Sequence, residues 1–186
     1  MDEDVVTLIL NDLKEVADRP LTPTDIQDLK DALFESDAVF SRVLESDRSY
    51  FVTGSYNPRE EQRLLAVKQA LAGRRVGDHA FLMKDVPAFT SNFVLKFHVL
   101  IRRTDVVVGV FEHNRGGHEW EAGALSEPSL RRKTWILKRK YATEKEEREA
   151  FDAMLAHFFE LIDEHGHLLH WRTDTELIEH TESEIP

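Results

Sequence analysis

The segment from Glu112 to Glu121 concentrates polar side chains around two glycines and reads Glu-His-Asn-Arg-Gly-Gly-His-Glu-Trp-Glu. Glu119 and Glu121 lie two residues apart, so on a helix they diverge by about 200° and cannot both face one pocket. An ionised, positioned carboxylate is the nucleophile that attack on an anomeric carbon requires. We expect it to stay ionised in the first turn of a helix, because free N–H groups and the backbone dipole favour its charge. On composition alone, acids that simply stabilise a helix start are the commoner explanation.

Two polar loops have the position and composition of a ligand site, because each follows a predicted strand. In an open parallel sheet, ligands bind beyond the carboxyl ends of the strands, where the strand order reverses. Glycine allows close backbone approach, and the helix N-terminus after each loop would favour an anionic or polar ligand group. His113 and His118, which lie in the second loop, could act as a general acid or contact the ligand. The alternative is that both are ordinary surface histidines. The predicted binding residues in these loops are Gly54, Ser55, Tyr56, Asn57, His113, Asn114, Gly116, Gly117 and His118.

Several other chemistries find little support in the sequence. The chain has no cysteine, which excludes disulfides, thiolate metal sites and cysteine nucleophiles. Its nine histidines form no helical metal-binding pair with a third ligand, so we expect neither a metal nor a cofactor. Gly54 stands alone, without a dinucleotide fingerprint, and Ser55 lacks the flanking glycines of a nucleophile elbow. Trp120 and Trp135 are more typical of a core than of a stacking platform.

The composition indicates one folded domain with an acidic surface. The chain has 186 residues, of which 41 % are hydrophobic, and a formal net charge of -11. An acidic chain disfavours nucleic acid and anionic membranes as partners. The apolar runs are too short to cross a bilayer, and the first ten residues lack the basic region of a signal peptide. We therefore expect a cytoplasmic protein.

Strands alternate with amphipathic helices along the chain, which implies parallel crossovers. The run from Asp105 to Phe111 is almost continuously apolar, as expected where both faces of a sheet are covered. We predict a doubly wound α/β fold with a mainly parallel five-stranded sheet, flavodoxin- or Rossmann-like, and an N-terminal helical pair. The predicted division is a helical extension over residues 1–48 and an α/β domain over residues 49–186. Strands are predicted at 50–53, 79–83, 105–111, 134–137 and 167–171, and helices at 5–16, 26–34, 59–72, 91–103, 120–125, 144–164 and 174–184.

The central strand and the glycine-rich segment together resemble a family motif. An Asp-led apolar strand, a polar loop and then Gly-x-x-x-Glu-x-Gly-x-Ala form the central motif of the nucleoside 2-deoxyribosyltransferase-like superfamily. Here Asp105-Val-Val-Val-Gly-Val-Phe is followed by Gly117-His-Glu-Trp-Glu121-Ala-Gly123-Ala. The final alanine, Ala124, comes one residue early. Tyr-Phe-Val-Thr-Gly-Ser-Tyr, ending at Tyr56, also looks like that family's first strand and substrate loop, so the matches span roughly residues 50–140.

This resemblance implies an activity and roles for individual residues. In that family the glutamate matching Glu121 attacks C1′ of a nucleoside, and an acceptor base or water resolves the glycosyl-enzyme intermediate. Related TIR-like hydrolases cleave the nicotinamide–ribose bond of NAD. By the same resemblance, Gly123 would let the helix pack closely on a strand, and Ser55 or Tyr56 would contact sugar or base. The implied partner is a nucleoside or nucleotide, and the implied assembly is a homo-oligomer, because family members often complete each other's pockets.

The chain departs from the family in the residues that handle the base. Family transferases carry further aspartates that bind and protonate the base. The corresponding segments of this chain lack these aspartates, which favours hydrolysis, or binding without turnover, over transfer. One function is therefore an N-glycosidic-bond hydrolase or transferase, and the alternative is a non-catalytic nucleotide sensor that uses the same pocket. A purely structural interaction protein would leave the glycine loop unexplained. In place of the aspartates the loop offers His113, Asn114 and Arg115, and the preceding helix offers Asn92, Lys96 and His98.

Overall fold

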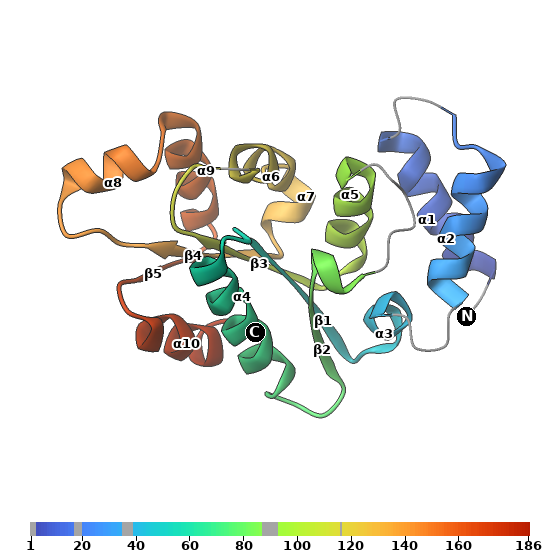
Figure 1. Ribbon diagram of the computed structural model, residues 1–186, viewed down its shortest axis with the longest axis horizontal. Coiled ribbons are helices and arrows are strands. Elements are labelled where there is room, and N and C mark those ends of the chain that lie inside the picture. Colours follow the sequence, from blue (N-terminus) through green and yellow to red (C-terminus); the bar gives the residue numbers. More distant parts are fainter. Residues whose placement is uncertain (1–2, 17–19, 35–38, 87–92, 116) are drawn as a thin grey trace.

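The computed structural model describes residues 3–16, 20–34, 39–86, 93–115 and 117–186. Its centre is one sheet of five parallel strands in the order β2-β1-β3-β4-β5 (Figure 1). The predicted doubly wound α/β class is confirmed, and each predicted strand overlaps an observed one. The strands are β1 (Arg48–Gly54), β2 (Asp78–Leu82), β3 (Val106–Phe111), β4 (Thr134–Arg139) and β5 (Leu168–Trp171).

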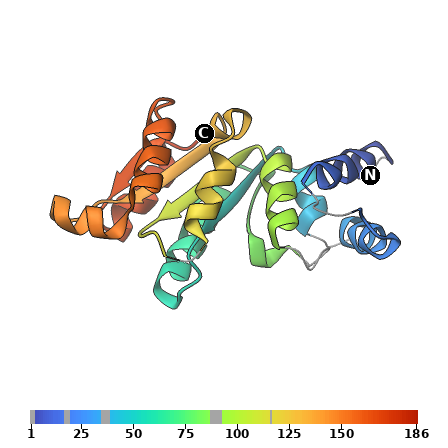
Figure 2. The same cartoon turned by 90° about the horizontal axis from the view of Figure 1, so that it is seen from above.

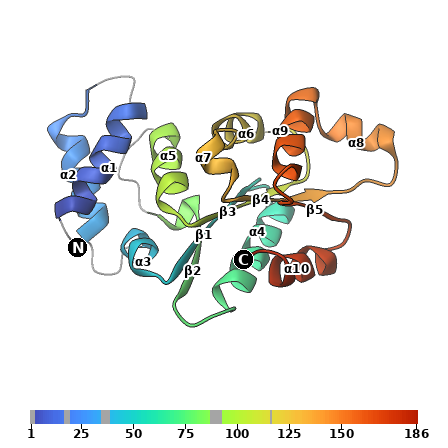
Figure 3. The same cartoon turned by 180° about the vertical axis from the view of Figure 1, so that it is seen from behind.

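Helices cover both faces of the sheet (Figures 1 and 3). One face carries α4 (Pro58–Ala72) and α10 (Asp174–Ser183). The other face carries α5 (Phe93–Arg103), α6 (His118–Leu125), α7 (Pro128–Arg131) and α9 (Ala153–Asp163). No helix in the described ranges combines the length and the apolar composition that a membrane span needs.

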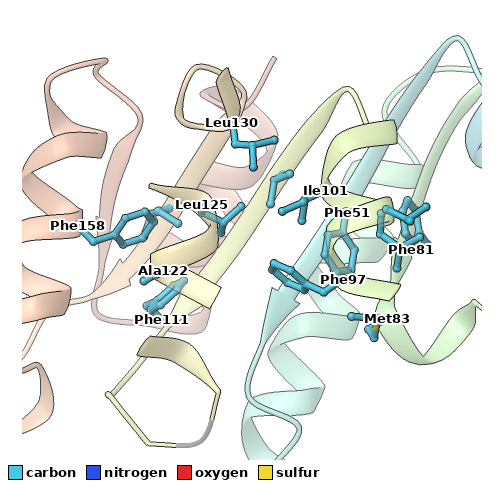
Figure 4. Close-up of a cluster of buried hydrophobic side chains, with 14 of the residues drawn as sticks. Phe51, Phe81, Met83, Phe97, Ile101, Phe111, Ala122, Leu125, Leu130 and Phe158 are labelled. Carbon is cyan, nitrogen blue, oxygen red and sulfur yellow. The ribbon is translucent and has the colours of Figure 1, made fainter. Parts of the chain in front are cut away.

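The central strand β3 is buried along its whole length, as its continuous apolar run predicts. Its side chains alternate between the two layers of the core. Val107 and Phe111 join the cluster beneath α5, α6 and α9, whereas Val108 and Val110 join the cluster beneath α4 and α10. Figure 4 shows part of the first cluster, with Phe111 next to Ala122 of α6. The carboxyl end of β3 is therefore fixed against the first turns of α6.

The N-terminal helices pack at the β2 end of the molecule, beside α5 (Figure 2). They are α1 (Glu3–Val16), α2 (Pro23–Phe34) and α3 (Val39–Glu45), of which α3 was not predicted. Ile9 and Leu13 of α1 are buried in the same cluster as α5. Asp12 accepts a hydrogen bond from Arg103 Nε at 2.7 Å. The N-terminal segment thus shares a core with the sheet, while a domain boundary at residue 48 stays a prediction.

The single helix predicted over residues 144–164 is wrong, because two helices occupy this stretch. α8 (Glu144–Ala150) ends before Phe151, whose backbone is extended, and α9 begins at Ala153. Asp152 caps α9 by accepting a hydrogen bond from the amide of Leu155 at 2.9 Å. Aspartate is a preferred N-cap residue, so it competes with a continuous helix at this point. The sequence also gave no signal for α7 or for the short 3-10 turn η1 (Met83–Asp85).

Candidate functional site

The two predicted loops meet at the point where the strand order reverses. In the chain β1 is followed by β2, but β3 lies on the other side of β1 in the sheet. The crossovers that leave β1 and β3 therefore run to opposite sides, and open α/β sheets bind their ligands at this position. Gly54 pairs with Val110, so the loops after β1 and β3 leave the carboxyl edge as neighbours. We call this position the switch point.

Gly54 allows this close approach of the two strands and α4. A Cβ atom at Gly54 would lie 2.8 Å from the carbonyl oxygen of Val110 and 2.8 Å from a methyl carbon of Leu64. A backbone oxygen paired within the sheet cannot move aside easily, so a larger residue would push the loop away from β3. Gly117 is different, because a Cβ there would have no described atom within 4 Å. Gly117 serves as the N-cap residue of α6.

Glu121 points into the protein from the first turn of α6. Its amide donates to the Gly117 carbonyl at 2.9 Å. Glu121 is only 6 % exposed, whereas Glu119 lies on the exposed side of the helix, as their spacing predicts. Thr53, the buried penultimate residue of β1, supplies the hydroxyl that interacts with the Glu121 carboxyl. The Oε2 atom of Glu121 is buried and has no hydrogen-bond partner among the described residues.

Burial raises the pKa of Glu121 from 4.5 to about 7, and the hydrogen bond with Thr53 opposes this only in part. The expectation that this carboxylate stays fully ionised is therefore wrong, since a pKa of about 7 leaves part of it protonated at neutral pH. A rise from 4.5 to about 7 corresponds to roughly 3 kcal/mol. A helix dipole contributes about 0.3–1 kcal/mol, so desolvation outweighs the helix start. The carboxyl group can consequently serve either as an acid or as a nucleophile near neutral pH.

Tyr56 lies within electrostatic reach of this carboxyl, and its hydroxyl reaches the backbone just after β2. Burial raises the pKa of Tyr56 to about 12, and the charge of Glu121 adds to the rise. Hydrogen bonds from the backbone at Met83 and Lys84 act in the opposite direction. The phenol is therefore protonated at physiological pH, while 40 % of the residue remains exposed. Tyr56 thus joins the buried carboxyl to the protein surface.

Glu60 of α4 ties the two loops together. Burial alone would raise its pKa, but hydrogen bonds with Ser55, Asn57 and His113 hold the pKa below its usual value. Asn57 Nδ2 donates to Glu60 Oε2 at 3.0 Å, and His113 Nε2 lies 3.0 Å from Glu60 Oε1. The polar groups of three predicted binding residues are therefore engaged with a carboxylate of the protein. They fix the shape of the switch point.

The sequence reasoning missed both Thr53 and Glu60. Thr53 lies two residues after Phe51, so strand alternation could have placed it on the same face of β1, toward α6. Glu60 lies three residues after Asn57 at the helix start, where a glutamate commonly folds back onto the preceding residues. Both signals are present in the sequence but are too common to single out a site.

The rings of His113 and His118 in the second loop are stacked, and their hydrogen bonds define which ring nitrogen carries the proton. His113 Nδ1 accepts a hydrogen bond from the amide of Arg115 at 3.1 Å, so its Nε2 carries the proton that faces Glu60. His118 Nδ1 donates to the His113 carbonyl at 2.7 Å, which leaves Nε2 as an acceptor. Burial lowers the pKa of His118, which keeps the ring neutral. Among the described residues, nothing bonds to His118 Nε2.

The remaining predicted binding residues lie apart from Glu121 or outside the described part. The amide of Asn114 donates to the Ala150 carbonyl at 2.8 Å, and its side chain reaches Asp152 at 3.5 Å, so it anchors the loop to α8 and α9. Gly123 is exposed, and a Cβ there would meet no described atom within 4 Å. Its implied role in close helix–strand packing is therefore wrong. Gly116 falls outside the described residues.

Some of the side chains that could replace the family's aspartates already have interaction partners within the protein. Lys96 donates to the Val86 carbonyl, and burial lowers its pKa. The His98 ring meets the edge of Trp120, with ring centroids 5.8 Å apart. Asn92 lies outside the described residues. Arg115 is exposed within the second loop.

A cavity of about 390 Å³ opens beside the second loop, toward α8. This volume is in the range of small-molecule sites. Arg115 and the Tyr141 ring give it one cation and one aromatic face. It is lined by His113, Asn114, Arg115, Tyr141, Glu146, Glu149 and Ala150.

Asp105, which leads the motif strand, lies at the opposite edge of the sheet. Its carboxylate accepts hydrogen bonds from the Ser49 amide at 2.8 Å and the Ser49 hydroxyl at 2.7 Å. The Asp105 amide in turn donates to the Ser49 hydroxyl at 3.0 Å. These bonds join the starts of β1 and β3, so Asp105 positions the strands rather than a ligand.

A second buried glutamate, Glu112, follows β3 directly. Arg63 Nη1 lies 3.0 and 2.9 Å from its two carboxylate oxygens, and Arg139 Nη1 lies 2.7 Å from Oε2. Both guanidinium groups also lie over the Trp171 ring, 5.4 and 5.6 Å from its centroid. Arg63 is further paired with Asp174 at 2.7 Å. Glu112 is therefore a fully paired carboxylate that joins β3, α4, β4 and α10.

Together these observations define an α/β protein whose switch point holds a buried carboxyl group, one oxygen of which has no hydrogen-bond partner among the described residues. Within the described ranges, no cluster of three or more His, Cys, Asp or Glu side chains could hold a metal ion. The model of a family of unknown function (DUF8170) matches residues 21–155, which is more than half of the chain. The chain belongs to this family. No curated protein and no solved structure matches it.

Proposed function

We propose that this protein cleaves the N-glycosidic bond of a nucleoside, nucleotide or NAD-like ligand, with Glu121 as the nucleophile. The observation that carries the proposal is the buried Glu121 carboxyl at the switch point, whose Oε2 has no partner in the described part of the chain. Strongly perturbed, buried titratable groups at a ligand position are functional-site candidates. The resemblance of the motif around Glu121 points to the same residue.

The proposed reaction uses the ionised form of Glu121. One carboxylate oxygen forms a bond to C1′ while the bond from C1′ to the base nitrogen breaks, and the base leaves with that electron pair. A nucleobase then takes up a proton from solvent, whereas the nicotinamide of an NAD-like ligand leaves as the neutral base without one. Water then attacks C1′, loses a proton to solvent and releases the carboxylate, or an acceptor base does so in a transfer. The Thr53 hydroxyl orients the carboxyl, and the second loop carries, on its other side, the cavity lined by Arg115 and Tyr141. A homo-oligomer in the cytoplasm is part of the same proposal.

The second candidate is a nucleotide sensor without turnover. A carboxyl group with a pKa of about 7 is partly protonated at neutral pH, and a protonated carboxyl binds a ligand without attacking it. In the family the additional aspartates that protonate a leaving base lie in the loop before the glutamate and on the preceding helix, and the described residues of that loop and of α5 contain no aspartate. In this function the N-terminal helices, which share a core with α5, would pass ligand occupancy to a partner.

Base release distinguishes the two functions. The protein is incubated with ribonucleosides, 2′-deoxyribonucleosides, their 5′-monophosphates and NAD, and free base is measured by chromatography. The enzyme function predicts base release by the wild type and by Glu119→Gln, a matched control on the exposed side of α6, but not by Glu121→Gln. The rate should also rise with pH through about 7, because only the ionised carboxylate attacks. Tight binding of a nucleotide with no base released over hours would favour the sensor.

A further inference from the structure

Two polar atoms on α6 are buried without a hydrogen-bond partner in the described part of the chain, His118 Nε2 and Glu121 Oε2. His118 is 2 % exposed and Glu121 is 6 % exposed. The residues lie three apart, so they share one side of the helix and their Cβ atoms lie about 5–6 Å from each other. Folded proteins rarely leave buried polar atoms unpaired, because the lost hydrogen bond is costly. Among the buried atoms without a partner in the described chain, these two share one side of α6 at the switch point, which makes this helix face a candidate position for a ligand that supplies the partners.

When Glu121 is ionised, as it is above its pKa of about 7, both atoms accept hydrogen bonds and neither donates one. The proton of the His118 ring is on Nδ1, which donates to the His113 carbonyl at 2.7 Å, so Nε2 presents a lone pair. The ionised carboxylate of Glu121 also only accepts. The missing partner is therefore a group with two neighbouring donors. A phosphate or carboxylate does not fit, whereas a pair of hydroxyl groups does.

The sheet holds the two acceptors over neighbouring strands. The His118 ring lies on Phe111 at the end of β3, with ring centroids 4.9 Å apart. The Glu121 carboxyl interacts with Thr53 near the end of β1. Because β1 and β3 are paired up to Gly54 and Val110, the floor beneath both acceptors is fixed by the sheet itself. A preorganised pair of this kind discriminates between ligands by their donors.

From this arrangement we infer that the switch point selects a ribosyl group with free 2′- and 3′-hydroxyls over a 2′-deoxyribosyl group. The inference rests on the proposed function, in which one oxygen of Glu121 reaches C1′. The second oxygen of the same carboxylate then lies next to C2′, so the 2′-hydroxyl donates to it, as in other retaining glycosyl transfers. His118 Nε2 accepts from the neighbouring 3′-hydroxyl. A 2′-deoxyribosyl group would leave Glu121 Oε2 unpaired.

The test compares matched ligands on the wild-type chain. Dissociation constants are measured by NMR titration at pH 8 for each ribonucleoside 5′-monophosphate and its 2′-deoxy counterpart, and for ribose 5-phosphate and 2-deoxyribose 5-phosphate. We expect each 2′-deoxy ligand to bind at least about tenfold more weakly, the effect of one lost hydrogen bond to a charged group. Equal affinities within each pair would overturn the inference. Absence of binding by every ligand would overturn it as well.

A variant at position 118 tests whether His118 Nε2 is the second acceptor. Asparagine at position 118 can still donate to the His113 carbonyl but has no atom at Nε2, so His118→Asn should bind a ribonucleotide and its 3′-deoxy counterpart equally well. Glu119→Gln serves as the control and should keep the wild-type preference. Preference for ribose 5-phosphate without base release from any nucleoside would keep the inference and contradict the proposed function. Base release with no preference for the ribosyl ligand would keep the function and contradict the inference.

Discussion

Glu112 and Glu121 are both buried glutamates at the carboxyl edge of the sheet, yet their surroundings are opposite. Glu112 is 3 % exposed and both its oxygens face guanidinium groups. Glu121 is 6 % exposed, and in the described ranges its Oε2 faces no donor. Residue type and burial are the same, so the difference lies in the partners that each carboxylate has.

The comparison separates a carboxylate that holds the fold from one that, in the proposed function, contacts a ligand. Arg63 and Arg139 neutralise Glu112 and connect three strands and two helices through it, together with Trp171. Glu121 has a raised pKa because the protein removes it from water and compensates with little more than the Thr53 hydroxyl. A buried carboxyl with little compensation at such a position is a functional-site candidate, which is why the proposed function assigns its free oxygen to a ligand.

The largest difference between the two glutamates should appear in activity. In the proposed function Glu121→Gln removes the nucleophile, so it should lower base release by about a thousandfold or more, as loss of a catalytic group typically does. Activity is measured as released base per protein under saturating ligand. Glu112→Gln should keep a measurable rate in whatever fraction remains folded. Similar activity losses per folded molecule in the two variants would contradict the separation of roles.

The reverse ranking should hold for stability. Glu112→Gln leaves Arg63 and Arg139 without their carboxylate, which should lower the free energy of unfolding by about 3–5 kcal/mol, nearer the lower value because Arg139 is partly solvated. The free energy is measured by urea unfolding at pH 7. Replacement of Glu121 by glutamine should cost far less. A Glu112→Gln protein as stable as the wild type would show that the paired carboxylate does not hold the fold.

The ionisation of Glu121 should make stability depend on pH. Below about 4.5 its carboxyl is protonated in both the folded and the unfolded chain, so it has no effect. Between 4.5 and about 7 only the unfolded chain loses the proton, so stability falls as pH rises and levels off above 7. Relative to the wild type, Glu121→Gln should gain up to roughly 3 kcal/mol between pH 4 and pH 8. A difference between the two proteins that is constant with pH would contradict the raised pKa.

Substitutions at two glycines test the packing around the site, and their expected effects on stability are smaller. Gly54→Ala should destabilise the protein by about 2 kcal/mol, because its Cβ meets the Val110 carbonyl and Leu64 at 2.8 Å. Gly123→Ala should stabilise it by about 0.5–1 kcal/mol, because alanine favours the helix and, within the described residues, no atom obstructs its Cβ. Thermal unfolding of both variants checks the signs. Destabilisation by Gly123→Ala would restore a packing role for this residue.

The sequence predicted the frame of the site well but not its electrostatics. The apolar run of Asp105 to Phe111 predicted the central strand, and the two-residue spacing of Glu119 and Glu121 predicted that only one carboxyl points inward. These features follow from local periodicity. The raised pKa of Glu121 could not be predicted, because it depends on how deeply α6 packs over Thr53.

Errors in the sequence prediction arose where a local signal competed with a stronger one. The apolar pattern over residues 144–164 favoured one helix, but Asp152 caps a new helix instead. Glu60 was missed because its role needs partners from two loops, Asn57 and His113, that only the folded sheet brings together. Its neighbours in the chain give no sign of the second loop.

The central claim is that Glu121 is a buried carboxyl without a charge partner in the described chain. Its direct test is a pH titration of the Glu121 carboxyl carbon by NMR, with the resonance assigned by its disappearance in Glu121→Gln. The account predicts a midpoint near pH 7. A midpoint near the ordinary value of about 4.5 would show a solvated or paired carboxylate and would contradict the account.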